Sequence, residues 1–296
     1  MKHVGWGVLG AASIAGSAVL PAIAAAGNGR LVAVSSRSAD RARQMVAPYP
    51  EARASESYQA LLADPEVDAV YIPLVNSLHK EWSLRAFAAG KHVLCEKPIA
   101  MNAEEAEAMA EAADAAGLLL MEGFMYRFHP DVKEFIANLN APTYVHATFG
   151  FRLGSNENFR TQASLGGGAL LDVGCDAANV TRAIMGEPVD VVAQGTFDGG
   201  VDITVSALLA FADGRSATVW VSMDSPSEQQ LAVVTQQDVH RMESPFVRPR
   251  RPHDSYRLMV ESFGDSVLHG RPVALAPADS IANMKVLDRI RASATR

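Results

Sequence analysis

A regular alternation of short apolar segments and helix-forming segments occupies residues 3–123 and constrains the fold more than any other feature of this sequence. Segments typical of strands are 3–10, 31–36, 67–74, 92–98 and 118–123. Segments typical of helices lie between them, at 13–26, 38–47, 55–63, 79–89 and 103–117. Short β-branched strands that alternate with helices form βαβ units, so we predict an α/β region with a doubly wound parallel sheet.

The pattern changes after this region, because strand-like segments then follow one another without helices. They are 143–153, 189–197, 203–211 and 216–223, and the turn sequences DGG and ADGR join the last three. Helices are expected after Pro130 and at 172–185, 254–269 and 278–294. Hairpin-linked strands predict an open antiparallel sheet with helices. We therefore expect two domains, residues 1–122 and an α+β domain of residues 123–296.

Composition excludes several classes of function. The 296 residues carry 26 Lys and Arg against 33 Asp and Glu, a net charge of -7, which argues against non-specific binding to nucleic acid. The two cysteines, Cys95 and Cys175, are too few for a disulfide framework and are consistent with a reducing compartment, the cytoplasm. The histidines and cysteines show no spacing typical of a metal site, so we expect no metal.

Two segments have more than one interpretation. The uncharged run from Val4 to Gly27 could be a membrane span or a signal peptide, but glycines and Pro21 interrupt it, which favours a strand, a turn and a helix and no membrane partner. The basic sequence RPRRPHDSYR at 248–257 is either a solvated loop or a contact for an anionic ligand or partner.

The junction of the first strand and first helix resembles a dinucleotide-binding turn. The fingerprint G-x-G-x-x-G/A reads Gly10-x-Ala12-x-x-Ala15 here. Gly10 permits the tight turn and Ala15 permits close packing, whereas the methyl group of Ala12 crowds the approach of a pyrophosphate. The residues expected at the pyrophosphate are Gly10, Ala11, Ala12, Ser13 and Ile14. A Gly/Ala-rich turn without a ligand is the alternative.

The end of the second strand bears on which dinucleotide is bound. An acidic residue there would bind the ribose 2′-hydroxyl, but the sequence is SSRS and no carboxylate occurs before Asp40. The hydroxyl of Ser36 and the guanidinium groups of Arg37 and Arg41 suit a 2′-phosphate. This set favours NADP over NAD, unless Arg37 is only a solvated surface residue.

Several segments together resemble the glucose–fructose oxidoreductase and inositol dehydrogenase family. They are GVLGAASIA, YIPLVNSLHKEWSLRAFAAGKHVLCEKPIA, MEGFMYRFHP, NFRTQASLGGGALLDVG and VESFGDSVLHGRPV. The sequences of these segments are most similar to those of the dihydrodiol and xylose dehydrogenase branch, which uses NADP(H). The resemblance implies an N-terminal Rossmann domain and a C-terminal substrate domain on an open antiparallel sheet. It also implies an oxidoreductase that transfers a hydride between the nicotinamide and a sugar, polyol or cyclic diol or ketone.

The resemblance assigns roles to residues at the ends of two strands. Lys97, in the Glu96-Lys97-Pro98 motif, would lie beside the nicotinamide and the reacting carbon, where a cation stabilises a developing alkoxide. Alone, Lys97 would read as a solvated charge. Further residues expected to flank the cofactor are Pro73, Leu74, Asn76, His79 and Glu96, with Val75 in place of a usual proline. His79 could equally be a helix residue that packs on the sheet.

Tyr126 and Arg127 fall where the substrate domain is expected to begin. By resemblance Arg127 lines the substrate pocket, with Tyr126 beside it. The alternative for Arg127 is a structural ion pair between domains.

The element D-x-G-x-[H/Y] begins at Asp172, and position 176, which holds the catalytic His or Tyr of the family, holds Asp176. Asp172, Asp176 and Asn179 share one helical face. By resemblance Asp172 would orient Lys97 or take part in the proton relay, and Asn179 would bind the substrate. A protonated Asp176 could be a general acid, and an ionised one a general base in alcohol oxidation. Alternatively Asp172 is an N-cap, Asp176 is solvated, and the chain is a non-catalytic dinucleotide-binding sensor or interaction protein. A methyltransferase-like Rossmann protein is a weaker alternative, against which the Glu-Lys-Pro motif argues.

The resemblance also implies a homodimer through the exposed face of the C-terminal sheet. The same resemblance implies two or three more strands between Met223 and Pro252 than this segment has room for. We therefore expect a smaller sheet, and a smaller sheet argues against the usual dimer.

Overall fold

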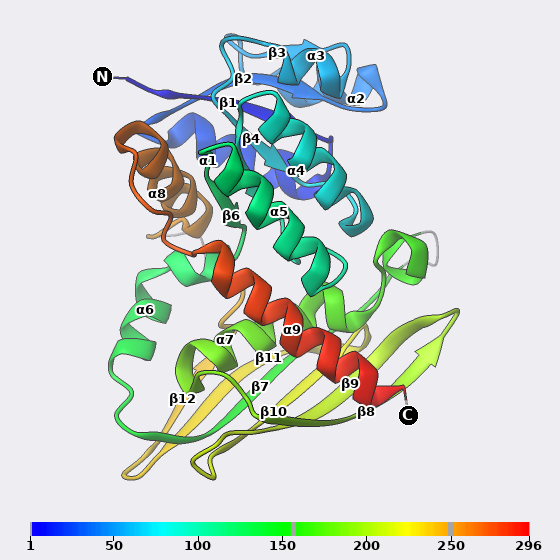
Figure 1. Cartoon of the computed structure of the whole chain (residues 1–296), viewed down its shortest axis with the longest axis vertical. Coiled ribbons are helices and arrows are strands. Elements are labelled where there is room, and N and C mark those ends of the chain that lie inside the picture. Colours follow the sequence, from blue (N-terminus) through cyan, green and yellow to red (C-terminus); the bar gives the residue numbers. More distant parts are fainter. Residues whose placement is uncertain (1, 155–157, 248–251, 296) are drawn as a thin grey trace. The chain divides into compact units, whose positions relative to one another are not determined.

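The computed structural model describes residues 2–154, 158–247 and 252–295. Its contacts divide the chain into two compact units (Figure 1). The first comprises Met1–Ile99, Glu104–Phe128 and Arg250–Ser280, and the second comprises Ala100–Ala103, His129–Pro249 and Ile281–Arg296. The single boundary expected after residue 122 therefore differs from this division, since residues 250–280 cluster with the N-terminal segment.

The first unit is built on a six-stranded sheet in the order β3-β2-β1-β4-β5-β6, in which all neighbouring strands are parallel. The strands are β1 Val4–Leu9, β2 Gly29–Ser35, β3 Arg53–Ser55, β4 Ala69–Ile72, β5 His92–Cys95 and β6 Leu120–Glu122. The predicted doubly wound parallel sheet is confirmed. The strand order reverses between β1 and β4, and ligands of such sheets bind at the carboxyl ends of strands at this point.

Helices lie between and after these strands, and the longer ones fall in the segments where the sequence pattern predicts helices. They are η1 Ala15–Val19, α1 Leu20–Ala25, α2 Ala39–Val46, α3 Tyr58–Leu62, η2 Asn76–Leu78, α4 His79–Ala88, α5 Ala103–Ala115, η3 Met125–Phe128 and α8 Ser255–His269. β1 is buried along its whole length. The rings of Trp6 on β1 and Phe263 on α8 have their centroids 5.6 Å apart. A helix from late in the sequence therefore completes the core of the N-terminal sheet.

The second unit is built on a six-stranded sheet in the order β12-β11-β7-β10-β9-β8. The strands are β7 Pro142–Arg152, β8 Asp190–Asp198, β9 Val201–Ala210, β10 Ser216–Ser222, β11 Asp224–Thr235 and β12 Val239–Glu243. The central pair, β7 and β10, is parallel, and the other pairs are antiparallel. The expected antiparallel sheet is thus confirmed except at this central pair. The long connection from β7 to β10 contains a helix and a hairpin, so the chain can return in the same direction.

Strands β11 and β12 occupy a segment in which the sequence analysis identified no strand. β11 is irregular, with a register shift between Asp224 and Glu228 against β7, and its first half is polar and contains Pro226. Such a composition has a low strand propensity. The segment after Met223 thus contributes two strands, so the expected shortage of strands was overstated.

The helices of the second unit are α6 Pro130–Ala137, η4 Phe159–Thr161, η5 Ala163–Leu165, η6 Leu170–Gly174, α7 Cys175–Met185 and the greater part of α9 Pro277–Ala294. α7 packs on β7 and β10, and Ser293 of α9 accepts a hydrogen bond from the N–H of Ala193 on β8 at 2.9 Å. In the part of the chain that the structure describes, no helix combines the length and the apolar character needed to cross a membrane.

Candidate active site

The turn after β1 has the backbone geometry of a phosphate-binding turn. Gly10 has a φ of 126°, which L-residues rarely adopt, and a Cβ at this position would lie 2.9 Å from Cδ2 of Leu74. The N–H of Gly10 donates to the carbonyl oxygen of Ser35 at 2.8 Å. Ser13 is exposed at the start of the following helix, so the N–H groups of its first turn are available to an anion.

Arg41 is bound to this turn from the neighbouring helix. Its Nη2 donates to the carbonyl oxygen of Ala11 at 2.7 Å. The hydroxyl of Ser38 caps α2 by accepting from the N–H of Arg41 at 3.4 Å, and Ser36 Oγ accepts from the N–H of Ser38 at 3.2 Å. Arg37 is exposed. Both arginines predicted to bind a 2′-phosphate are exposed, but they differ because the guanidinium group of Arg41 is hydrogen-bonded to the turn.

Tyr58 supports the segment that carries Arg37, a role that the sequence did not indicate. The phenol oxygen interacts with the backbone N–H of Arg37, and burial raises the pKa of this phenol. The Tyr58 ring meets the ring of Trp82 edge-on at 4.7 Å between centroids. The backbone beside the predicted ribose contact is thereby held by a packed aromatic pair.

A cavity of about 380 Å³ adjoins the glycine turn. It is lined by Ala11, Ser13, Gly16, Arg41, Gln44, Met45, Pro48 and Tyr49. Hydroxyl, amide and guanidinium groups occur together with apolar side chains in this lining, as in sites that bind small polar molecules. The cavity extends the predicted cofactor surface toward α2.

His79 takes the second of its two interpretations and packs in the interior. It is fully buried, with Nδ1 2.9 Å from the carbonyl oxygen of Pro98 and Nε2 2.9 Å from that of Leu74. A neutral imidazole has one N–H, so only one of these contacts is a donated hydrogen bond. Burial lowers the pKa of His79. The ring thus joins the ends of β4 and β5, and the direct cofactor contact expected of it is replaced by this positioning role.

The Glu-Lys-Pro corner after β5 is held by a carboxylate with two partners. Tyr71 donates its phenol hydrogen to Oε1 of Glu96 at 2.5 Å, and Oε2 of Glu96 accepts from the N–H of Lys97 at 3.2 Å. Burial, followed by the charge of Glu96, raises the pKa of Tyr71 well above its usual value, so the phenol stays protonated. Lys97 is half-buried and precedes Pro98 through a cis peptide bond.

A second carboxylate fixes the far side of the same corner. Oε1 of Glu122, at the end of β6, accepts from the N–H of Ile99 at 2.9 Å. Glu122 and Tyr71 were not identified from the sequence, although each is a polar residue in an otherwise apolar strand, which is the signal that could have found them. In the first unit, Gly10, Ser36, Pro73 and Lys97 all follow the carboxyl ends of parallel strands, and Asn76 is buried just beyond β4.

Tyr126 and Arg127 lie in η3, still within the first unit. Tyr126 is fully buried and meets Phe124 edge-on at 6.0 Å. Arg127 Nη1 lies 4.0 Å from Oδ2 of Asp279, a residue of the same unit. The carboxylate nearest to Arg127 in this contact thus belongs to its own unit, so the contact is not the ion pair between domains of the alternative interpretation, and the substrate-pocket role stays a prediction.

In the second unit, the two carboxylates of the GGGALLDVGCD stretch have different surroundings. Asp172 Oδ2 accepts from Nε of Arg160 at 2.7 Å, whereas the N-cap of η6 is Ala169. Asp176 is only 4% exposed, and the thiol of Cys175 lies 3.8 Å from its Oδ2. The interpretations of Asp172 as an N-cap and of Asp176 as a solvated residue are both wrong. Asn179 is fully buried one turn further along α7.

Two glycines before this helix lie too close to other groups to carry a side chain. A Cβ on Gly167 would lie 2.4 Å from the carbonyl oxygen of Arg160, and one on Gly168 would lie 2.3 Å from Oδ1 of Asp202. Asp202, on β9, is another residue that the sequence analysis missed. Side chains at either glycine would displace the backbone that presents Arg160 or the carboxylate of Asp202.

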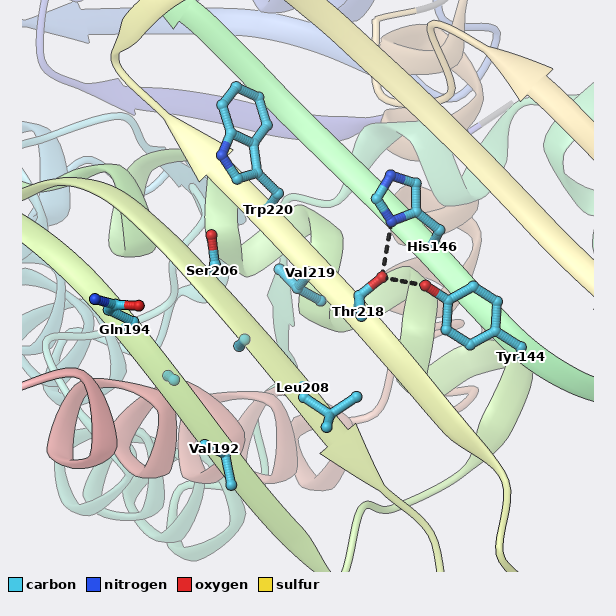
Figure 2. Close-up of a pocket in the computed structure, with 11 residues that line it drawn as sticks. Tyr144, His146, Val192, Gln194, Ser206, Leu208, Thr218, Val219 and Trp220 are labelled. Carbon is cyan, nitrogen blue, oxygen red and sulfur yellow. Dashed lines mark hydrogen bonds between the residues drawn. The ribbon is translucent and has the colours of Figure 1, made fainter.

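The sheet of the second unit has a face with a large open depression of about 730 Å³ (Figure 2). Figure 2 shows Tyr144 and His146 directed toward Thr218, whose Oγ1 lies 2.5 Å from the phenol oxygen and 2.8 Å from Nδ1 of the imidazole. Beside this cluster, Val192 is 61% exposed and Leu208 is 47% exposed. This face therefore combines apolar and polar groups, as protein interfaces do.

Two further expectations concern ions. Within residues 2–154, 158–247 and 252–295, no group of three or more His, Cys, Asp or Glu side chains is arranged to hold a metal. The core of the basic sequence, 248–251, lies outside the described residues. Its last part is described, and there Asp254 caps α8 by accepting from the N–H of Tyr256 at 3.0 Å.

Two family models match the chain. Residues 4–124 match the NAD-binding Rossmann fold of an oxidoreductase family, and residues 132–240 match the GFO/IDH/MocA C-terminal domain. D-xylose 1-dehydrogenase (NADP(+)) 2 of Haloferax volcanii is 36% identical, over 98% of this chain and 97% of that protein.

Solved structures agree with these matches. The 3-ketoreductase KijD10 of Actinomadura kijaniata, solved with NADP and TDP-benzene, superposes with a TM-score of 0.92 at 30% identity, over 99% of this chain and 98% of that one. Aldose-aldose oxidoreductase of Caulobacter crescentus, solved with glycerol, has a TM-score of 0.92 at 26% identity with the same coverage. With both halves of the family pattern present along one chain, this protein belongs to the GFO/IDH/MocA family of oxidoreductases.

Proposed function

We propose that this chain is an NADP-dependent oxidoreductase that transfers a hydride between the nicotinamide and a sugar, polyol or cyclic diol or ketone. The observation that carries the proposal is the Glu96–Lys97 corner, where a cation follows the carboxyl end of a parallel strand in the same sheet as the Gly10 turn. The names of the relatives, an NADP-dependent xylose dehydrogenase and an NADP-bound ketoreductase, support the same reaction class.

The residues around the glycine turn fit a dinucleotide phosphate. The left-handed backbone at Gly10 leaves room for the turn, and the exposed helix start at Ser13 offers N–H groups to the pyrophosphate. Ser36 and Arg37 are proposed to bind the 2′-phosphate, with Arg41 holding the carbonyl of Ala11 behind the turn. When bound, NADP supplies the hydride acceptor or donor.

Lys97 is proposed to polarise the substrate oxygen, with its backbone fixed through Glu96. Asp176 is proposed as the acid–base group in place of the tyrosine of related enzymes. Asp172, held by Arg160, is proposed to orient Lys97 or to take part in the proton relay. Asp176 is only 4% exposed. Aspartate side chains are rarely buried to this extent unless they have a specific partner, which argues for a retained role. An ionised carboxylate favours proton removal, and hence alcohol oxidation. Arg127, Tyr126 and Asn179 remain the proposed residues of the substrate site.

The test is a turnover assay of the purified chain with NADP⁺ or NADPH and a panel of sugars, polyols and cyclic diols. We expect hydride transfer with NADP(H) and weaker activity with NAD(H). The second candidate is a sensor that binds the dinucleotide without turnover, which the replacement of tyrosine by Asp176 favours. Tight NADPH binding with no turnover on the panel would support the sensor over the enzyme.

We also propose that a second copy of the chain covers the sheet face that carries Val192, Leu208 and Thr218. The apolar groups there are widely exposed, and large exposed patches on a folded chain mark interfaces. The buried thiols Cys95 and Cys175 are consistent with a cytoplasmic enzyme.

A further inference from the structure

We propose that Asp202 is a positioning residue for this reaction: from a neighbouring strand, its carboxylate caps the helical segment that carries Asp172 and Asp176. The inference rests on the proposed function, since it concerns the same two carboxylates. It adds a residue that lies outside every motif of the sequence.

The contact is short and buried. Oδ2 of Asp202 accepts from the N–H of Leu170 at 2.6 Å, and the N–H of Ala169 interacts with the same carboxylate. Asp202 is 8% exposed. The first N–H groups of a helix have no partner within the helix, and a carboxylate satisfies them. Burial raises the pKa of Asp202, and the hydrogen bonds from these N–H groups act in the opposite direction. The cap comes from β9, whereas most helices are capped by the residue just before them.

The backbone before the helix is shaped around this carboxylate. Gly168 has a φ of 110°, and a Cβ there would lie 2.3 Å from Asp202 Oδ1. The carbonyl oxygen of Gly168 accepts from the N–H of Asp172 at 3.1 Å. The position of Asp202 therefore sets the start of the helix, and Asp172 follows directly from that start.

The segment that follows is a π-helical turn, which has a wider spacing than an α-helix. It is fixed at its beginning by Asp202 and at its end by Asn283, whose Nδ2 donates to the carbonyl oxygen of Cys175 at 3.1 Å. Arg160 holds Asp172 between these two points. Loss of the contact with Asp202 would allow the turn to change its helical register. A change of register by one residue would rotate Asp172 and Asp176 away from their present directions.

The experiment compares D202A, which removes the acceptor, with D202N, which keeps an acceptor oxygen. D198A, at an exposed position of β8, is the matched control. We expect D202A to lower kcat about tenfold or more, with KM for NADPH unchanged, and D202N to retain most of the wild-type kcat. G168A should reproduce D202A, because its methyl group would displace the carboxylate. A merely structural cap would lower the melting temperature without this division between kcat and KM.

The outcomes separate the two proposals. If the wild type turns over and D202A keeps kcat within twofold of D198A, or D202N falls as far as D202A, the positioning role is overturned. If the wild type shows no turnover, the proposed function fails, and hydrogen exchange of residues 169–176 decides the cap. Faster exchange in D202A than in D202N and D198A supports it, and equal exchange overturns it. Should D202A not fold, D202N and G168A give the same comparison.

Discussion

The phenol oxygen of Tyr71 lies 2.5 Å from Oε1 of Glu96, while Oε2 of the same carboxylate accepts from the N–H of Lys97. The side chain of a buried strand residue thereby fixes the backbone of the proposed catalytic lysine through one carboxylate. The hydroxyl of Tyr71 has no other part in the proposed reaction, so its removal tests whether the orientation of Lys97 depends on this bond.

The Tyr71→Phe variant should lower kcat while the KM for NADPH stays unchanged. It should also lower the free energy of unfolding by about 1–3 kcal/mol, because a buried acceptor loses its donor. Steady-state kinetics and urea unfolding measure both effects. Tyr144→Phe, in the second unit, is the control for loss of a hydroxyl. A Tyr71→Phe enzyme with wild-type kcat would contradict the role given to Glu96.

The two arginines near the glycine turn should respond differently to removal. Arg37→Ala should weaken NADPH binding about 10- to 100-fold and leave NADH binding unchanged, since a lost charge-assisted bond to the 2′-phosphate costs about 1.5–3 kcal/mol. Arg41→Ala should weaken both nucleotides, because its bond to Ala11 O supports the turn that both would use. Arg43→Ala, exposed on α2, is the control. Fluorescence titration measures all four affinities, and equal losses in both variants would contradict the assignment.

Position 176 should distinguish the enzyme from the sensor. If Asp176 removes the proton from the alcohol, Asp176→Asn should lower kcat/KM for oxidation about a hundredfold or more while NADPH binding remains. Asp176→Tyr should restore the acid group of the related enzymes and increase ketone reduction. Turnover of both variants at the wild-type rate would remove Asp176 from the mechanism.

One buried histidine and one half-buried histidine should make the fold sensitive to acid. Burial lowers the pKa of His79 and of His92 below the ordinary value of 6.5, so below pH 6.5 the unfolded chain binds more protons than the folded one. Stability should therefore be constant well above this value and fall as the pH drops through it. Nδ1 of His92 also accepts from the N–H of Leu119 at 3.0 Å, a bond that protonation breaks.

Urea unfolding at a series of pH values measures this loss. His92→Gln should reduce the slope of stability against pH near neutrality, whereas His269→Gln, exposed at the end of α8, should leave it unchanged. A stability that increases on acidification through the same range would contradict the assignment.

The proposed homodimer is tested at the exposed sheet face. Leu208→Glu places a charge on a residue that is 47% exposed in the single chain, and it should convert a dimer to a monomer because an unpaired charge cannot be buried. Light scattering after size exclusion gives the mass. A wild-type chain that is monomeric at high concentration would overturn the proposed interface.

The sequence predicted those features whose signal is local. The order of strand, glycine turn and helix at residues 3–26, and the lysine after β5, follow from neighbouring residues alone. The three-residue strand β3 is too short to show a pattern, and the parallel pairing of β7 with β10 depends on a partner more than sixty residues away. Local sequence carries no information about such a partner.

The residues of the candidate site likewise differ in whether a local sequence signal indicates them. Gly10, Arg37 and Asp176 stand in motifs, so their types and spacing indicated them. Asp202 and Tyr71 act through contacts with distant segments, and nothing adjacent to them in the chain specifies those contacts. The burial of Asp176 likewise depends on tertiary packing, which the local sequence does not specify.

The packing of Trp6 against Phe263 has a consequence for biosynthesis. Asn28, just before β2, also donates to the carbonyl oxygen of Glu261 on α8 at 2.8 Å. The parallel sheet therefore lacks one of the helices that cover it until α8 has left the ribosome. The nascent chain must emerge almost completely before the first strand it made can be sealed from water. A gene truncated after residue 128 would accordingly yield a product with an open apolar surface, prone to aggregation and a poor choice for isolating the nucleotide-binding half.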